Sequence, residues 1–397
     1  MKKYFFFAAA ALLALAACSK VTPVELPDEE ISFKVVNYVN STKADGQGTE
    51  PDEHTPAHNN LTNDFGVYAF MTNDTEWANW GADNDLVVYM PGVQVSPVQD
   101  AGTAWAPVST YYWPKKGLLT FAAWSPFAAT PSSYAWDADD DEENVFSKVF
   151  TYTDYEVASK DSGDADYVDL MISDLAKDYT KQKEAVLLDT DRHFADNGVP
   201  MLFRHILTKL VFQFKEAAYP EAYTTDPDGE GEKKPTVDIN QSSITITEVK
   251  LVNFVAKNTY TGGAWTVNTT AGEGEYVLSN PAELKPTGAE GENVEASATE
   301  PMILPQTLIE EGQALYIKYK ITTYYNEGGE VTENNVTATV PFYGSLKKEG
   351  STYDNKFEMN KKIVFTVTIS PFAEDEIKFD PAVVPWETDI TGAIEVK

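Results

Sequence analysis

Apolar and polar residues alternate along most of this chain, and this period of two constrains its fold more than any other feature. The pattern is strongest in residues 243–255 (SITITEVKLVNFV) and 362–370 (KIVFTVTIS). Alternation places apolar side chains on one face of a strand, and β-branched and aromatic residues pack well on a pleated sheet. After residue 17, no stretch has the spacing of a helix longer than about three turns. The sequence therefore predicts an all-β protein of two stacked sandwich domains.

A charged stretch rich in Gly and Pro divides the predicted strands into two groups. This stretch, residues 219–236, contains the sequence DPDGEGEKKP, which is typical of a linker. A chain of 397 residues is long enough for two domains, predicted over residues 45–218 and 237–397. The other expected strands or hairpins are residues 31–39, 65–71, 86–90, 111–114, 118–124, 167–173, 200–215, 261–267, 301–308, 315–325 and 336–342.

Residues 1–17 have the composition of a secretory signal peptide. Two lysines precede an apolar run over residues 4–15, which is shorter than the about 20 residues that span a membrane. The sequence LAAC ending at Cys18 matches a bacterial lipobox, in which the cysteine thiol is acylated and becomes the new N-terminus. The alternative is a plain cleaved signal with a coincidental cysteine. Cys18 is the only cysteine, so no internal disulfide can form.

Acidic residues outnumber basic ones by 62 to 30, which gives a formal net charge of −32. Nucleic acid and anionic lipid surfaces attract basic patches, so this charge argues against both as electrostatic partners. Hydrophobic residues make up 43% of the chain and aromatic residues 12%, which indicates a globular chain rather than a disordered acidic one. The charge is compatible with a soluble face held away from a membrane.

The sequence has no recognisable catalytic or metal-binding pattern. Aspartates at positions 137, 139 and 141 have the initial spacing of a calcium loop, but Glu142 stands where that loop needs glycine and Lys148 where it needs its last ligand. His205 is expected to be a strand residue, and a single cysteine leaves no zinc set. Neither a G-x-S-x-G motif nor a nucleotide-binding glycine loop is present. We therefore expect no enzymatic activity and no cofactor.

Residues 31–39 (ISFKVVNYV) form a strand pattern between the acylation signal and a basic residue. Four of the apolar residues share one face of the strand. Residues 42–63 follow without periodicity, which predicts an exposed connection around Lys43 that a protease can reach. Cleavage after Lys43, within the predicted lipidated segment 18–44, would remove the residues up to Lys43 together with their strand and open a hydrophobic groove. The alternative is an ordinary first strand that stays permanently in place.

The end of the chain carries a second unusual feature. From Trp386 to Val396 the even positions, which include Ile390 and Ile394, are mostly apolar, whereas the odd positions are mostly acidic or polar. A chain end usually frays, so an amphipathic strand kept to the end suggests that something covers it. Residues 386–397 are therefore a candidate donor strand for a groove of the kind left by residues 31–39. The alternative is a normal last strand within its own sheet.

These segments, in this order, resemble the fimbrillins, the type V pilins of anaerobic Gram-negative bacteria. The similarity lies in the lipobox, ISFKVVNYV followed by TKA, FGVYAFM, YYWP with LLTFAAWSP, LFRHILTKLVF, ITITEVKLVN and VPWETDI. The resemblance implies a lipoprotein precursor exported to the outer-membrane surface, with two transthyretin-like β-sandwich domains. It also implies that a trypsin-like protease removes the acylated segment with its first strand, and that a terminal strand of a neighbouring subunit fills the groove.

The sequence departs from the family at the processing site. Family members are cleaved after arginine, whereas the matching position here is Lys43, and the first arginine of the chain is Arg192. Either a protease that accepts lysine acts, or the subunit stays uncut and anchored by its lipid.

We expect a structural fimbrial subunit that supports adhesion, with other fimbrial subunits, the outer membrane and a surface glycan or protein ligand as partners. The rival interpretation is a surface glycan-binding lipoprotein whose tryptophans stack on sugar rings. For this role, Trp77 and Trp80 are expected in an exposed loop. The tryptophans considered are Trp77, Trp80, Trp105, Trp113 and Trp136.

Overall fold

The computed structural model confirms the predicted all-β class. Within the ranges that it describes, the chain is almost entirely strand, with one short helix, α1 (Trp77–Trp80). Cys18, Lys43, the predicted linker 219–236 and the candidate donor strand 386–397 lie outside the described residues. The described residues are 30–36, 61, 63–73, 75–81, 86–98, 104–136, 146–157, 168–182, 193–194, 198–216, 243–278, 283–284, 294–295, 300–324, 331–346, 355–369 and 377–385.

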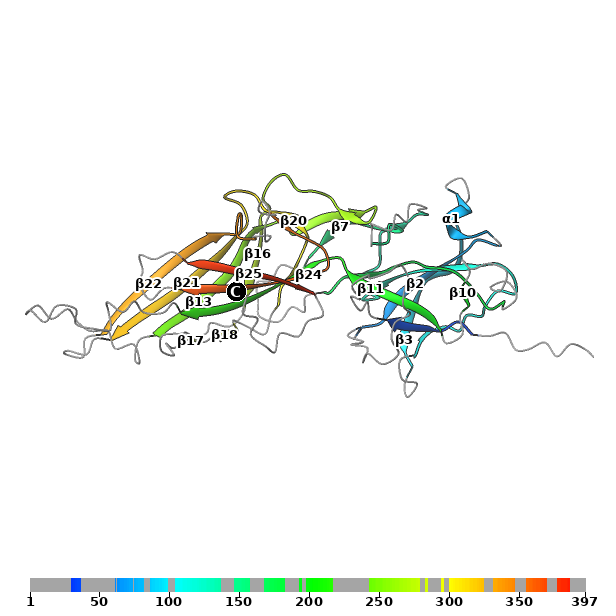
Figure 1. Cartoon of the computed structure of the whole chain (residues 1–397), viewed down its shortest axis with the longest axis horizontal. Coiled ribbons are helices and arrows are strands. Elements are labelled where there is room, and N and C mark those ends of the chain that lie inside the picture. Colours follow the sequence, from blue (N-terminus) through cyan, green and yellow to red (C-terminus); the bar gives the residue numbers. More distant parts are fainter. Residues whose placement is uncertain are drawn as a thin grey trace, which may run out of the picture.

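The molecule is elongated, and its two groups of strands follow one another along its long axis (Figure 1). The N-terminal group is a nine-stranded sheet of order β10-β9-β5-β2-β3-β4-β1-β11-β8. Its strands are β1 (Phe33–Val36), β2 (Phe65–Met71), β3 (Val87–Pro97), β4 (Ala104–Pro107), β5 (Leu119–Ser125), β8 (Met171–Ser173), β9 (Ala176–Thr180), β10 (His193–Phe194) and β11 (Val199–His205).

The N-terminal sheet closes on itself through β5. The first part of β5 pairs with β9 through Leu119 and Phe121, whereas its end pairs with β8 through Trp124 and Ser125. Since β8 also pairs with β11, the strands β5-β2-β3-β4-β1-β11-β8 form a closed ring. A closed ring has no free sheet edge among its members. The strand β1 is therefore an internal strand, with β4 on one side and β11 on the other.

The C-terminal group consists of two larger sheets that face each other, and a small two-stranded sheet (Figure 1). One sheet has the order β18-β12-β24-β25, with β19 also on β12, and the other has the order β16-β13-β21-β22, with β17 on β13. The strands are β12 (Thr208–Glu216), β13 (Ser243–Phe254), β16 (Gly274–Leu278), β17 (Glu283–Leu284), β18 (Val294–Glu295), β19 (Met302–Ile303), β20 (Gln306–Thr307), β21 (Ala314–Tyr324), β22 (Val331–Pro341), β23 (Lys356–Phe357), β24 (Lys361–Ile369) and β25 (Lys378–Pro385).

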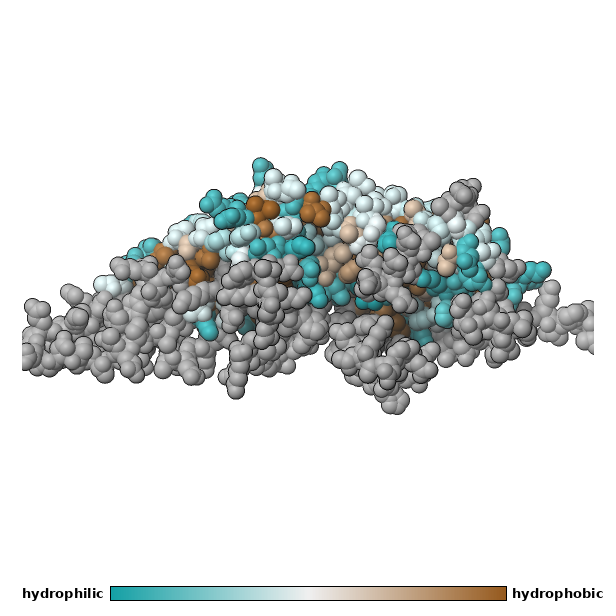
Figure 2. Space-filling view, turned by 45° about the horizontal axis from the view of Figure 1, so that its top comes forward, coloured by the Kyte–Doolittle hydropathy of each residue, from teal (hydrophilic) through white to brown (hydrophobic). Residues whose placement is uncertain are grey.

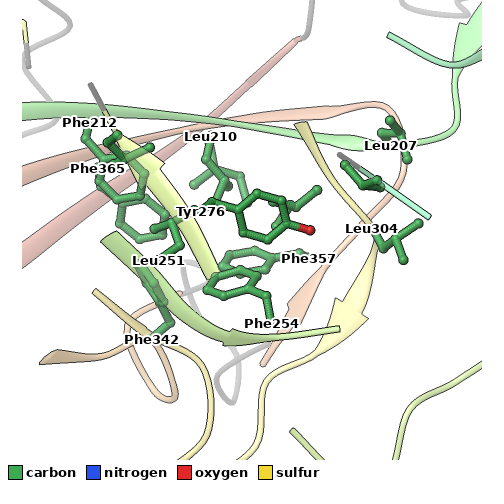
Figure 3. Close-up of a cluster of buried hydrophobic side chains, with 14 of the residues drawn as sticks. Leu207, Leu210, Phe212, Leu251, Phe254, Tyr276, Leu304, Phe342, Phe357 and Phe365 are labelled. Carbon is green, nitrogen blue, oxygen red and sulfur yellow. The ribbon is translucent and has the colours of Figure 1, made fainter. Parts of the chain in front are cut away.

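Aromatic side chains fill the space between these two sheets (Figure 3). Phe212 stacks on Phe365 with ring centroids 5.4 Å apart, and Phe342 lies 5.0 Å from Phe365. Phe254 stacks on Phe357 at 6.0 Å. On β12 the buried residues Leu210, Phe212 and Phe214 occupy alternate positions, as the period of two in the sequence predicts. Phe342 instead directly follows β22, and Phe357 belongs to β23 of the small sheet. Since no disulfide can form, the packing of this core has to supply the stability of the C-terminal group.

A further sheet joins the two groups, and it was not expected from the sequence. Its order is β15-β14-β7-β6, formed by β6 (Ser133–Tyr134), β7 (Phe150–Glu156), β14 (Lys257–Thr261) and β15 (Ala264–Trp265). Because β7 precedes and β14 follows the predicted linker, pairing crosses the predicted boundary. The β14–β15 turn at Gly262 and Gly263 agrees with the expected hairpin.

The change from one group to the other occurs earlier than the predicted linker. The strand β11 belongs to the ring, whereas β12, which begins three residues after β11 ends, pairs with β24 in the C-terminal group. The sequence prediction treated residues 200–215 as one stretch and placed the boundary at 219–236. Polar composition marks where a chain is exposed, but the sheet that a strand joins depends on the apolar face that it meets.

The surface seen in Figure 2 is mostly polar or weakly polar, with small separate apolar patches among the described residues. Single exposed apolar residues are normal on a soluble surface. Within the described part of the chain, no helix has the length and apolar character needed to cross a membrane.

Candidate functional site: the groove occupied by β1

The strand β1 lies at the centre of the predicted strand 31–39 and buries one of its faces. Ile31, Phe33 and Val35 are 2%, 1% and 6% exposed, whereas Lys34 and Val36 between and after them are half-buried. Burial of three such side chains contributes roughly 5–9 kcal/mol, which is comparable to the net stability of a domain. The groove that holds β1 is therefore a strongly apolar site.

Backbone pairing holds β1 on both sides. It runs parallel to β11, with Phe33 opposite Val199, and antiparallel to β4, with Phe33 opposite Trp105. At its start, the Ile31 N–H donates to the Tyr111 carbonyl at 2.7 Å, and the Val199 N–H donates to the Ser32 carbonyl at 2.9 Å. If β1 were absent, β4 and β11 would each present a row of unpaired backbone groups, which is the usual template for strand addition.

Polar contacts fix the β11 wall of the groove independently of β1. The Arg204 guanidinium forms two hydrogen bonds with the Asp174 carboxylate, at 2.7 and 2.8 Å. Burial raises the pKa of the Asp174 carboxyl, and the Arg204 guanidinium opposes that shift. His205 Nδ1 lies 2.7 Å from Asp169 Oδ1. Both carboxylates lie just outside β8, so these contacts tie β8 to β11.

The β4 wall is likewise held by its other neighbour. The strand β4 pairs with β3 through Ala106 and Trp105, and the Val98 N–H donates to the Ala104 carbonyl at 2.9 Å. On the opposite side of the ring, the Ala123 N–H donates to Ser173 Oγ at 2.8 Å, which fixes β5 to β8. Both walls of the groove thus have partners other than β1.

The apolar floor of the groove is a cluster of side chains from six other strands of the ring. It contains aromatic rings from β2, β4 and β5, and its smaller members line the remaining space. Sequence reasoning did not identify these residues, because they are far apart in the chain and each has an ordinary apolar strand pattern. Its members on the six other ring strands are Phe65, Val67, Ala69, Met90, Val95, Trp105, Leu119, Phe121, Ala123, Met171, Val199 and Met201.

The predicted residues for lipidation, processing and strand donation are outside the described ranges. Those residues are Cys18, Lys43, Trp386, Ile390, Ile394 and Val396. The donor segment follows β25, whose last residue, Pro385, is opposite Lys361 at the start of β24. The strand β25 is at the end of the strand order of its sheet. An edge strand needs fewer ladder hydrogen bonds, so the prolines at 381 and 385 are tolerated there.

The tryptophans proposed as sugar platforms are mostly inside the protein. The expectation that Trp77 is exposed is wrong: it is 1% exposed, and its backbone N–H donates to Asp178 Oδ1 at 2.8 Å. Trp105 and Trp113 are 4% and 7% exposed, and both belong to the ring core. Trp80 and Trp136 are half-buried. A buried ring cannot stack on a sugar, so the geometry disfavours the glycan-platform interpretation.

No metal site emerges from the part of the chain that is described: no three His, Cys, Asp or Glu side chains are grouped to hold an ion. The Asp-rich residues 137–141 lie outside that part. His205 is a strand residue paired with Asp169, as expected from its apolar surroundings in the sequence.

Comparison with known proteins places this geometry in context. The profile of a family described as fimbrillin-like matches residues 53–386. A search of curated proteins found no match. Because the family profile covers most of the chain, it is the comparison on which a family assignment can rest.

Solved structures give weaker likenesses. A protein from Bacteroides uniformis provisionally assigned to cell adhesion is 18% identical, with 90% of this chain and 99% of that chain covered at a TM-score of 0.42. The tip fimbrial protein Mfa3 from Porphyromonas gingivalis, with a C-terminal truncation, is 12% identical, with 82% and 94% covered at 0.31. The fimbrial anchor protein Mfa2 from the same organism is 12% identical, with 90% and 98% covered at 0.26. The fold described above rests on strand pairing rather than on these likenesses.

Proposed function

The chain belongs to the fimbrillin-like family, and on that premise we propose that it is a structural subunit of a fimbria at the cell surface. The subunit is exported as a lipoprotein precursor acylated at Cys18, and it reaches the outer-membrane surface attached by that lipid. Its partners are other fimbrial subunits, and the assembled fimbria supports adhesion. The family assignment supports a structural rather than an enzymatic role.

Assembly proceeds by strand exchange. A protease that accepts lysine cuts after Lys43 and releases the segment that contains β1. Residues 386–397 of a neighbouring subunit then enter the groove and pair with β4 and β11 in place of β1. Repetition of this step from subunit to subunit produces a polymer.

The single observation that carries this proposal is the position of β1 in a closed ring. The strand is close to the N-terminus in sequence, yet it is paired on both sides and buries Phe33 almost completely. Its loss exposes apolar surface and two unpaired strand edges, whereas both walls keep their other partners. Such a groove has a strong affinity for another amphipathic strand.

Processing of the purified precursor with a trypsin-like protease tests this proposal. We expect the wild-type protein to lose the residues up to Lys43 and to form a ladder of polymers that resists mild heating in detergent. The Lys43→Ala variant should remain monomeric under the same treatment. N-terminal sequencing of fimbriae from the cell surface provides the decisive check. A mature protein that begins upstream of residue 31 contradicts exchange and identifies an uncut anchor subunit.

A further inference from the structure

Phe33 is the most enclosed residue of β1. It is 1% exposed, and it has a register partner on both sides, Val199 on β11 and Trp105 on β4. Val35 has a register partner on β11, Met201, but none on β4, and it is 6% exposed. The groove therefore encloses the side chain at the position of Phe33 more completely than the side chain at the position of Val35.

The Phe33 phenyl group also links two aromatic side chains in the interior of the closed ring of strands. Its centroid lies 5.9 Å from that of Phe65 and 5.5 Å from that of Phe121, with interplanar angles of 82° and 85°. Edge-to-face contacts of this kind are attractive beyond the area that they bury. Phe65 in turn contacts Trp105 at 5.4 Å, and Phe121 contacts Trp113 at 5.8 Å. An aromatic side chain at this position completes a network that no smaller residue could complete.

Gly198 allows the backbone of the strand in the groove to approach β11 closely at the position of Phe33. Its φ is +85°, and a Cβ atom at this position would lie 3.1 to 3.3 Å from the backbone atoms of Phe33. The start of β11 thus lies directly against the Phe33 backbone because residue 198 has no side chain. An occupant is therefore held closely here, and its side chain at this level has to point into the aromatic cluster.

We infer that the site formed by Phe65, Trp105, Phe121, Gly198 and Val199, here called the Phe33 pocket, selects the strand that the groove accepts. The occupant has to place a large apolar side chain, best an aromatic one, in the pocket, with a smaller apolar side chain two residues away. This inference rests on the proposed function, since it supposes that β1 is exchanged. Within residues 386–397 the aromatic residue is Trp386, but the residue two positions after it is the polar Thr388. Ile394 is the large apolar residue that has a smaller apolar one, Val396, two positions away, whereas the corresponding neighbours of Ile390 are Thr388 and Gly392. Ile394 therefore meets both parts of the requirement.

Peptide binding to the protease-processed protein tests the inference. The probe is a fluorescent peptide of residues 30–40, and its matched control carries the double substitution I31F/F33I, which keeps the composition and moves the aromatic ring to the neighbouring site. We expect the control to bind at least about 30-fold more weakly, because it loses two edge-to-face contacts and places a ring in a site without them. Equal affinities of the two peptides overturn the inference and leave the groove in place. If neither peptide binds, both the proposed function and the inference fail.

A second measurement uses the full chain without processing. The Phe33→Ala variant should take up the labelled wild-type peptide at least about tenfold faster than the Ile31→Ala variant, because β1 loses its main anchor only in the first. Equal rates of uptake overturn the inference even if the processed protein does not stay folded. A faster uptake by the Ile31→Ala variant would place the anchor at the start of the strand instead and would also overturn it.

Discussion

At the scale of single residues, Gly66 shows how a missing side chain shapes the packing of the ring. It lies on β2 opposite Trp124 on β5. A Cβ atom at position 66 would overlap the Trp124 ring, which is 1% exposed and cannot move into solvent. The tryptophan therefore fills the space that any other residue at position 66 would need.

Substitution Gly66→Ala should lower the free energy of unfolding by roughly 1–3 kcal/mol or more, because the buried indole has to shift. The matched control is Gly262→Ala, at a turn with φ +59° and no atom within 4 Å of the added Cβ. That control should cost about 1 kcal/mol, from backbone strain alone. Urea denaturation of both variants measures the difference. A Gly66→Ala variant as stable as the control would contradict the packing described here.

Tyr155 predicts how stability changes at alkaline pH. Burial raises the pKa of its hydroxyl to about 12, and the nearby Asp169 carboxylate adds to the shift. The folded pKa is above the unfolded value of about 10, so the contribution to stability is complete below pH 10 and is lost as pH rises through about 12. We expect wild-type stability to fall more steeply than that of Tyr155→Phe over this range, measured by urea midpoints. Identical slopes would contradict the assignment.

At the scale of elements, β1 and β25, the strand that precedes the candidate donor segment, differ in how they are bound. The strand β1 is internal to a ring, whereas β25 is at the end of a strand order and contains two prolines. The segment after β25 therefore leaves from a sheet edge rather than from a sheet centre. Release of a chain end from an edge disturbs fewer hydrogen bonds than release of an internal strand.

Substitution Ile394→Asp should abolish polymerisation and leave the monomer folded. The aspartate would be buried without a partner in the Phe33 pocket of the next subunit, which costs several kcal/mol. Ala393→Asp is the matched control, since it places the same charge on the other, mostly polar face of the segment. Polymer ladders and circular dichroism of both variants test this prediction. If Ile394→Asp unfolds the monomer, the segment belongs to its own sheet, and if it polymerises normally, the segment is not the donor.

At the scale of the whole molecule, the two groups of strands are packed as a continuous body. The pairing of β7 with β14 crosses between them, and the Trp265 indole N–H donates to the Ile206 carbonyl at 2.5 Å. One apolar cluster extends from Trp124 of the ring to Phe365 of the C-terminal group. The two groups of strands therefore share one core, and their separation would expose apolar surface to water.

In the proposed function, the precursor is attached to the membrane by the lipid on Cys18. The Cys18→Ala variant should leave the membrane fraction, because it has no thiol at position 18 to carry the lipid. Ser19→Ala is the matched control and should remain in the membrane fraction. Fractionation of cells that express each variant, with detection of the protein in both fractions, measures the effect. Retention of Cys18→Ala in the membrane would rule out the lipid anchor.

The sequence by itself determined many of the strands and the faces that they bury, although the predicted strand 111–114 is not a strand, and β4, β7, β9 and β25 were not predicted. The period of two is a local property, so residues 31–39, 65–71 and 362–370 could be assigned without knowledge of their partners. The all-β class followed for the same reason. The family could also be recognised from the sequence, because its motifs are short runs of residues in a fixed order along the chain.

Only the tertiary structure decided which strands pair and where the groove is. Pairing joins residues far apart in the chain, such as Phe33 with Trp105 and Val199, and many registers satisfy the same alternation. The closure of the ring through β5, the Phe33 pocket and the joint of β7 with β14 all depend on such long-range choices. The expected exposure of Trp77 was wrong for the same reason, since its ring packs against Trp136 and its backbone N–H donates to Asp178, both of which are distant in sequence.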